Sequence, residues 1–67
     1  MNNNLIPKDL SNDQKLRLLR KALRDGRDIR KIPLFRADMY QVLVNGNADQ
    51  VKAMNALIDR AERRFGK

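Results

Sequence analysis

The sequence predicts a compact all-α domain of three helices, at about residues 11–25, 34–45 and 47–65, preceded by an extended N-terminal arm. Three observations lead to this fold class. Apolar residues recur at the three- and four-residue intervals of an amphipathic helix in each segment. Two of the segments begin with a helix-capping motif. The 67 residues suffice for one domain, so residues 11–67 are expected to form a single helical unit.

The first ten residues, MNNNLIPKDL, are predicted to form a flexible arm. Asn2–Asn4 are polar, and Pro7 prevents a helix from extending back through it. A frayed terminus explains such a segment, and an arm that orders on a partner is the alternative. Because the arm does not alternate polar and apolar residues, a ribbon-helix-helix protein is disfavoured.

The first predicted helix, residues 11–25, separates into an apolar and a cationic side. Ser11 and Gln14 have the S-x-x-Q spacing of a capping box, and Gly26 suits the left-handed position that follows a helix. Successive residues of a helix are about 100° apart. This spacing puts Leu16, Leu18, Leu19, Ala22 and Leu23 on one side and Arg17, Arg20, Lys21 and Arg24 on the other.

The second predicted helix, residues 34–45, is apolar on several sides, and Pro33 suits its first turn. Such a helix must be covered on more than one side, so we expect it to be the centre of the core or the seam of a homodimer. Tyr40, Val42 and Val44 alternate, which leaves a strand at 39–44 as the alternative. A helix is preferred because no second strand is available for pairing.

The third predicted helix follows a break at Asn45-Gly46-Asn47. Gly46 is expected to take the left-handed conformation at the end of the second helix. Asn47 and Gln50 form an N-x-x-Q variant of the capping box. We expect the second and third helices to form a hairpin across which the first helix packs, with a DNA-binding helix-turn-helix as the alternative.

The composition argues against several classes of protein. The chain lacks cysteine and histidine, so no metal site and no cofactor are predicted. No nucleophile–base pair or apolar carboxylate pair is evident, so catalysis is not expected. No apolar run approaches the roughly 18 residues of a membrane span, and the first residues do not resemble a signal peptide. A cytoplasmic protein that does not bind membranes is therefore expected.

The charge distribution predicts nucleic-acid binding. The chain has a net charge of +7, of which +6 lies in residues 1–36. A row of arginines on one helix face can bind successive phosphates of a nucleic acid. This pattern does not distinguish DNA from RNA. The candidate contacts are Arg17, Arg20, Lys21, Arg24, Arg27 and Arg30, with Lys52, Asn55 and Gln50 as candidates for base contact.

The alternative function is that of a small adaptor or inhibitor that binds another protein. Its candidate interface is the surplus apolar surface of the second helix, with Phe35, Met39, Tyr40 and Val44 as anchors. The basic residues would then steer the chain to an acidic protein partner. A homodimer is expected in either case, because a lone core of this size is marginal. By analogy, a short basic chain of this kind suits a regulator or accessory protein of a phage or plasmid.

Overall fold

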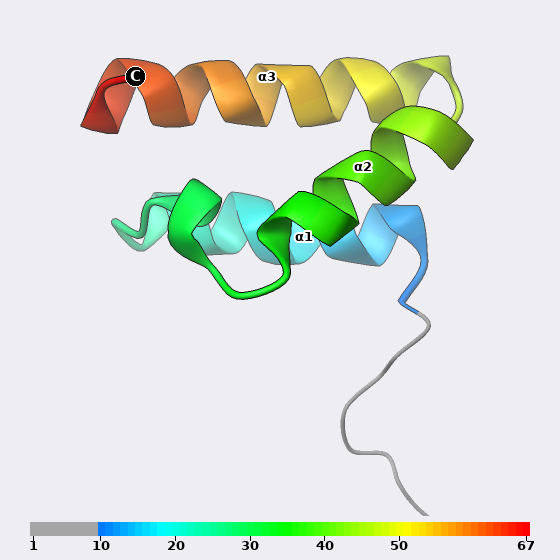
Figure 1. The fold of residues 1–67 in the computed structure, drawn as a ribbon, viewed down its shortest axis with the longest axis horizontal. Coiled ribbons are helices and arrows are strands. Elements are labelled where there is room, and N and C mark those ends of the chain that lie inside the picture. Colours follow the sequence, from blue (N-terminus) through cyan, green and yellow to red (C-terminus); the bar gives the residue numbers. More distant parts are fainter. Residues whose placement is uncertain (1–9) are drawn as a thin grey trace, which may run out of the picture.

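The computed structural model describes residues 10–67, which form three α-helices and one short 3-10 helix. Helix α1 spans Asn12–Arg24, η1 spans Ile29–Lys31, α2 spans Phe35–Asn45 and α3 spans Ala48–Phe65 (Figure 1). The described residues contain no strand, so the all-α prediction is confirmed and residues 39–44 are helical. The predicted arm lies outside the described residues except for Leu10, which is half-buried.

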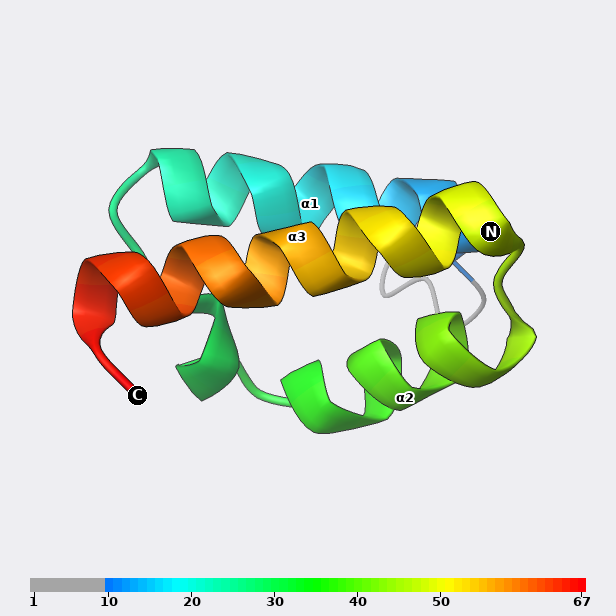
Figure 2. The same ribbon diagram turned by 90° about the horizontal axis from the view of Figure 1, so that it is seen from above.

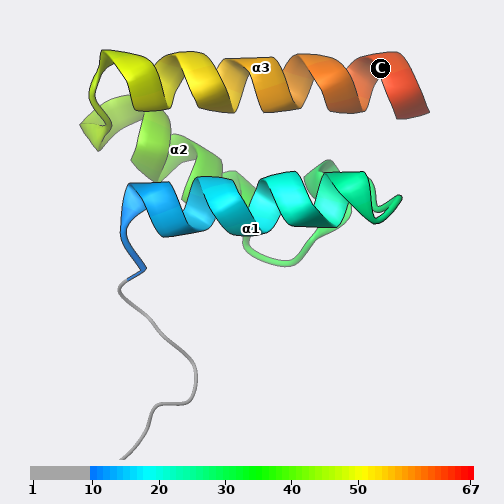
Figure 3. The same cartoon turned by 180° about the vertical axis from the view of Figure 1, so that it is seen from behind.

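Helices α1 and α3 run side by side in the same direction (Figures 1 and 3). The chain leaves the end of α1, returns through η1 and α2, and begins α3 beside the beginning of α1. Helix α2 crosses obliquely, and seen from above it lies on the opposite side of α3 from α1 (Figure 2). Helices α2 and α3 are joined by a short connection and pack against each other, as predicted for a hairpin, and α1 contacts both of them while running parallel to α3.

The core consists of apolar side chains from all four helical elements. Helices α1 and α3 contribute theirs at the same three-then-four spacing, which is the spacing of a coiled-coil seam. The buried residues are Leu16, Leu19, Leu23, Ile29, Phe35, Val42, Met54, Leu57 and Ala61. Leu18, predicted on the apolar side of α1, is instead 55% exposed.

Both ends of α1 have the predicted local structure. The Ser11 hydroxyl accepts a hydrogen bond from the Gln14 backbone N–H, and the Gln14 side chain accepts one from the Ser11 N–H. At the other end, Gly26 has a φ of +94°. The Gly26 N–H donates to the carbonyl of Leu23 and the Arg27 N–H to the carbonyl of Ala22, which is the Schellman pattern.

The start of α2 differs from its prediction. Pro33 does not occupy the first helical position, because residues 32–35 form a turn closed by a hydrogen bond of 3.0 Å from the Phe35 N–H to the Ile32 carbonyl. Leu34 has a φ of +67° and a ψ of 8°, the values of the third residue of a type II turn. This left-handed leucine is 76% exposed. Helix α2 therefore begins at Phe35 without a side-chain cap.

The α2–α3 connection also corrects one prediction. Gly46 has an extended backbone with a φ of −77°, so it does not take the left-handed position. Glycine is required at this position because there is no space for a side chain. A Cβ atom would collide with the carbonyl oxygen of Val42. The Asn47–Gln50 capping box is present as predicted, and α3 begins directly after it.

Candidate nucleic-acid interface

The cationic side of α1 faces solvent. Arg17, Arg20, Lys21 and Arg24 are exposed, as is Arg27 just after the helix. Within residues 10–67, ion pairs join Lys15 to Asp38, Arg30 to Asp28 and Arg63 to Asp59, so none involves these five cations. Their charges are therefore available to an external anion.

Gln50 joins the beginnings of the two parallel helices. Its side-chain oxygen accepts hydrogen bonds from the Asn47 N–H at 3.0 Å and from Asn12 Nδ2 at 3.3 Å. Its Nε2 donates to Asp13 Oδ1 at 2.9 Å. Both the oxygen and the nitrogen of this amide thus make hydrogen bonds within the protein.

This connection brings part of the α1 cationic side next to the start of α3. One polar surface hollow is lined from α1 by Asp13, Leu16, Arg17 and Arg20 and from α3 and its cap by Asn47, Asp49, Gln50 and Ala53. Two of the α1 arginines and the first turns of α3 therefore share one surface.

Arg64 makes the corresponding connection at the other end of the helix pair. Its Nη1 donates a 2.8 Å hydrogen bond to the carbonyl oxygen of Leu23 in the last turn of α1. Its guanidinium also lies over the ring of Phe65, with 5.4 Å from Cζ to the centroid. Arg64 thus adds a positive charge beside Arg24.

Arg60 lies on the same flank of α3. It follows Ala53 by seven residues, almost two full turns, and precedes Arg64 by one turn. Ala53 is in the hollow and Arg64 bonds to α1, so the flank between them faces the α1 side. We use the name α1–α3 face for Arg17, Arg20 and Arg24 of α1 together with Arg60 and Arg64 of α3.

The sequence prediction did not include Arg60 or Arg64. In the sequence alone, arginines in the last turns of a helix are explained by the negative end of the helix dipole. Their spacing in the sequence identifies them. Arg60 follows Ala53 by seven residues and Arg64 follows Arg60 by four, so all three lie on one flank of α3, beside the buried Leu57 and Ala61.

Arg30 does not belong to this face. It lies in η1, where its Nε and Nη2 donate to the two carboxylate oxygens of Asp28 at 2.9 and 2.8 Å. The hydrogen bond from the Arg30 side chain lowers the pKa of Asp28, and the same bond raises the pKa of Arg30. Glu62 of α3 also favours the charged Arg30, so this cation is neutralised within the fold.

Lys52 and Asn55 also lie apart from the α1–α3 face. Both are exposed on α3. Asn55 is two residues from Ala53, and therefore roughly 200° around the helix from the hollow. Lys52 is similarly two residues from the buried Met54 and points away from the core. The structure does not bring these predicted base contacts together with the exposed cations of α1.

The predicted protein-interface residues of α2 fall into two groups. Phe35 is 6% exposed and Met39 packs against the core, so both are used within this chain. Tyr40 is 68% exposed and Val44 59% exposed, one turn apart on the outer side of the helix. Leu34, which was not predicted, is a further exposed apolar side chain just before α2.

Comparison with known proteins gives no family for this chain: no family model, no curated protein and no solved structure matches it. Residues 10–67 contain no cluster of acidic side chains that could hold a metal ion. None of the helices in this range has the length and apolar character required to cross a membrane.

Proposed function

We propose that this protein binds the phosphate backbone of nucleic acid through the α1–α3 face. The observation that carries the proposal is the position of Arg17, Arg20 and Arg24, which are exposed and make no ion pair within residues 10–67, on the flank of α1 nearest α3. Helix α3 adds Arg60 and Arg64 on the adjoining flank. Guanidinium groups bind phosphate oxygens with two parallel hydrogen bonds, which favours arginine for this task.

Nucleic-acid binding through this face is expected to depend only weakly on base sequence. The role that we propose for the protein is regulatory or accessory. The polar amide of this surface, Gln50, is occupied by hydrogen bonds within the protein. Asp13 and Asp49 border the hollow and would repel phosphates that approach its centre. Phosphate contacts position a protein on nucleic acid, whereas base contacts are needed for specificity.

Salt dependence tests the proposal. Five phosphate contacts imply that affinity for duplex DNA falls by roughly 10²–10³-fold between 50 and 200 mM salt. Fluorescence anisotropy with a labelled DNA duplex and a labelled RNA hairpin measures this slope. An absence of binding to both at 50 mM salt would contradict the proposal.

A pair of charge-matched triple variants tests the surface itself. Arg17→Gln/Arg20→Gln/Arg24→Gln is expected to weaken binding at least tenfold and to flatten the salt slope. Lys31→Gln/Arg36→Gln/Lys52→Gln removes the same three charges from exposed positions elsewhere and is expected to stay within threefold of the original affinity. Equal losses in the two variants would show that net charge, and not the α1–α3 face, determines binding.

A second candidate function is docking onto an acidic protein through the outer side of α2. The specific observation is that Tyr40 and Val44, one turn apart on α2, and Leu34, just before this helix, are exposed apolar side chains. Retention of one protein partner from host extract after nuclease treatment and at high salt, with loss on Tyr40→Glu, would support docking. Retention that disappears with nuclease would support the first function.

A further inference from the structure

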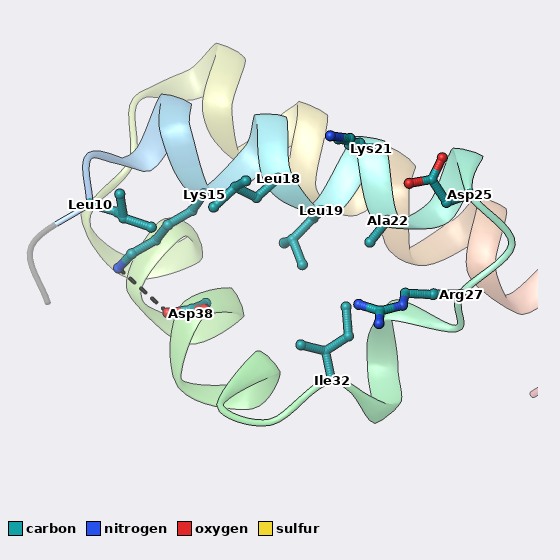
Figure 4. A pocket seen from close by; sticks show the side chains of 10 residues that line it. All are labelled: Leu10, Lys15, Leu18, Leu19, Lys21, Ala22, Asp25, Arg27, Ile32 and Asp38. Atoms are coloured by element: carbon teal, nitrogen blue, oxygen red, sulfur yellow. Dashed lines mark ion pairs between the residues drawn. The ribbon is translucent and has the colours of Figure 1, made fainter. Parts of the chain in front are cut away.

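A second surface, distinct from the α1–α3 face, lies between α1 and the η1–α2 segment. It is an open groove of about 350 Å³ (Figure 4). Its apolar lining consists of Leu10, Leu18, Leu19, Ala22 and Ile32, and its charged lining of Lys15, Lys21, Asp25, Arg27 and Asp38. The groove is bounded by the side of α1 that faces away from α3.

The apolar lining includes a leucine that the core does not use. Leu18 is 55% exposed, although the leucines on either side of it in the helical pattern, Leu16 and Leu19, are buried. The side chains of Leu19 and Ile32 point toward each other from the two sides of the groove (Figure 4), and we call this apolar pair its floor. Leu18 lines the same groove, so a partner that fills the groove would cover Leu18 as well.

The charged groups at the two ends of the groove differ. At one end the Lys15 ammonium pairs with the Asp38 carboxylate at 3.7 Å, which neutralises both and joins α1 to α2. At the other end the guanidinium of Arg27 extends over the groove between Ala22 and Ile32 (Figure 4). Arg27 makes no ion pair with Asp25 or with any other carboxylate in residues 10–67.

We propose that this groove binds a short acidic amphipathic helix of a partner protein. Apolar side chains of that helix would enter between Leu18, Leu19 and Ile32, and a carboxylate one turn away would pair with Arg27. A helix that presents apolar residues at i, i+3 and i+4 to a groove between two helices is a common mode of peptide recognition. The volume is at the lower limit for small-molecule clefts, and suits a few side chains.

Charge separates this occupant from the others. A nucleic-acid backbone gains nothing from the apolar floor. A second copy of this chain would bring more positive charge to Arg27, because the net charge is +7 and α1, its most amphipathic helix, is cationic. An acidic amphipathic helix would pack apolar side chains on the floor and pair a carboxylate with the Arg27 guanidinium. The positive charge of the protein attracts such a helix at long range.

A selection experiment on the full chain tests the proposal without nucleic acid. A displayed library of random 12-residue peptides is selected against the immobilised protein, and the most enriched peptide is synthesised with a fluorescent label. Enriched sequences are expected to combine Leu, Ile or Phe at helical spacing with Asp or Glu. In amide NMR spectra the peptide is expected to shift Leu18, Ala22, Arg27 and Ile32.

Variants of the groove decide the outcome. Leu18→Gln and Arg27→Glu are each expected to weaken peptide binding at least tenfold, and a peptide with lysine in place of its acid is expected to recover affinity for Arg27→Glu. Lys52→Glu makes the same charge change on the outer side of α3 and is expected to stay within twofold. Circular dichroism checks that Leu18→Gln is folded, as its exposure predicts.

Three results would overturn the proposal. They are the absence of enriched peptides, enrichment without acidic residues, and NMR shifts at Tyr40 and Val44 in place of the groove. A titration with octanoate that shifts the groove residues when no peptide does would assign the groove to a small acid. Because no step uses nucleic acid, this test can succeed or fail independently of duplex binding.

Discussion

Arg64 of α3 bonds to the last turn of α1: its Nη1 donates a 2.8 Å hydrogen bond to the carbonyl oxygen of Leu23, 41 residues earlier in the chain. Helix C-termini carry carbonyl groups without a partner in the helix, and a cation stabilises the negative end of the dipole. The Leu23 carbonyl also accepts the hydrogen bond of the Gly26 N–H, so Arg64 is its second donor and joins the two parallel helices at this end.

Replacing Arg64 is therefore expected to lower stability. Arg64→Met keeps much of the aliphatic stem but removes the hydrogen bond to Leu23, at a cost of about 1–2 kcal/mol for a partly exposed charged donor. Arg63→Met is the control, because the exposed pair of Arg63 with Asp59 is worth only a few tenths of a kcal/mol. Urea unfolding followed by circular dichroism measures both, and equal effects would contradict a role for the Leu23 contact.

Leu23 itself is expected to be essential for folding. Its side chain is 1% exposed between α1 and the rest of the core. Truncation to alanine typically costs about 2–5 kcal/mol at such a site. A single core of this size rarely supplies more than about 3–5 kcal/mol, so Leu23→Ala should be largely unfolded at 25 °C.

Leu18→Ala provides the comparison for Leu23→Ala. Leu18 lies on the same helix but is 55% exposed, so its truncation should cost less than about 1 kcal/mol. Thermal unfolding of the two variants distinguishes a core position from a surface position. A severe loss of stability in Leu18→Ala would show that the groove is covered within the folded protein.

The local elements of this fold could be predicted from the sequence because their signals are local. The capping pairs Ser11–Gln14 and Asn47–Gln50 and the left-handed Gly26 follow from residues within one turn of each other. The parallel arrangement of α1 and α3 could not, because it depends on Gln50 and Arg64 bonding to residues far away in the sequence.

The candidate site could be predicted only in part, because some of its residues are brought together by contacts between distant parts of the sequence. The charge of α1 is visible along one helix, whereas the contribution of Arg60 and Arg64 depends on which flank of α3 faces α1. Arg30 is predicted to extend the cationic row of α1, because the sequence does not reveal its pairing with Asp28. That bidentate pairing depends on the η1 turn. The charge pattern of the sequence thus indicates the α1 part of the α1–α3 face, whereas the packing of α3 on α1 determines which other arginines lie on it.

The backbone of Leu34 is expected to be strained. A left-handed conformation costs a residue with a Cβ atom roughly 1–2 kcal/mol, and a type II turn favours glycine or asparagine at this position. Leu34→Asn should therefore raise stability by about 1 kcal/mol, since the leucine side chain is 76% exposed and contributes little packing. Thermal unfolding measures the change.

Leu34→Val provides the opposite control at the same site. A β-branched residue tolerates a positive φ worse than leucine, so this variant should be less stable than the original protein. If Leu34→Asn and Leu34→Val shift the midpoint in the same direction, backbone strain at Leu34 is not the cause. A stabilised Leu34→Asn that loses protein docking would indicate that the exposed leucine serves a partner.

Acid is expected to destabilise the fold through Asp28. The hydrogen bond from Arg30 lowers the pKa of Asp28 in the folded state. Unfolded aspartate has a pKa of about 4, so the stabilisation is present above that value and is lost as the pH falls through the lower folded value. Asp28→Asn should lose less stability than the original protein between pH 5 and pH 2, as measured by thermal unfolding at each pH.

Asp59→Asn is the control for this pH dependence. The Asp59 carboxylate also pairs with an arginine, but the pair is exposed on the surface of α3. Such a pair is worth only a few tenths of a kcal/mol, so its removal should change the melting temperature little. Identical pH profiles for Asp28→Asn and the original protein would exclude Asp28 as the responsible group.

The outer side of α2 is expected to form the interface of a homodimer. Tyr40 and Val44 are exposed there, and the α1–α3 face would repel a second copy of itself through its arginines. Light scattering after size exclusion should therefore give twice the monomer mass of 7.8 kDa at high protein concentration. Tyr40→Glu/Val44→Glu should give the monomer mass with the same helical content, whereas Leu18→Glu, which alters the separate groove, should remain dimeric. A monomer mass for the original protein at every concentration would leave the α2 surface to a different partner.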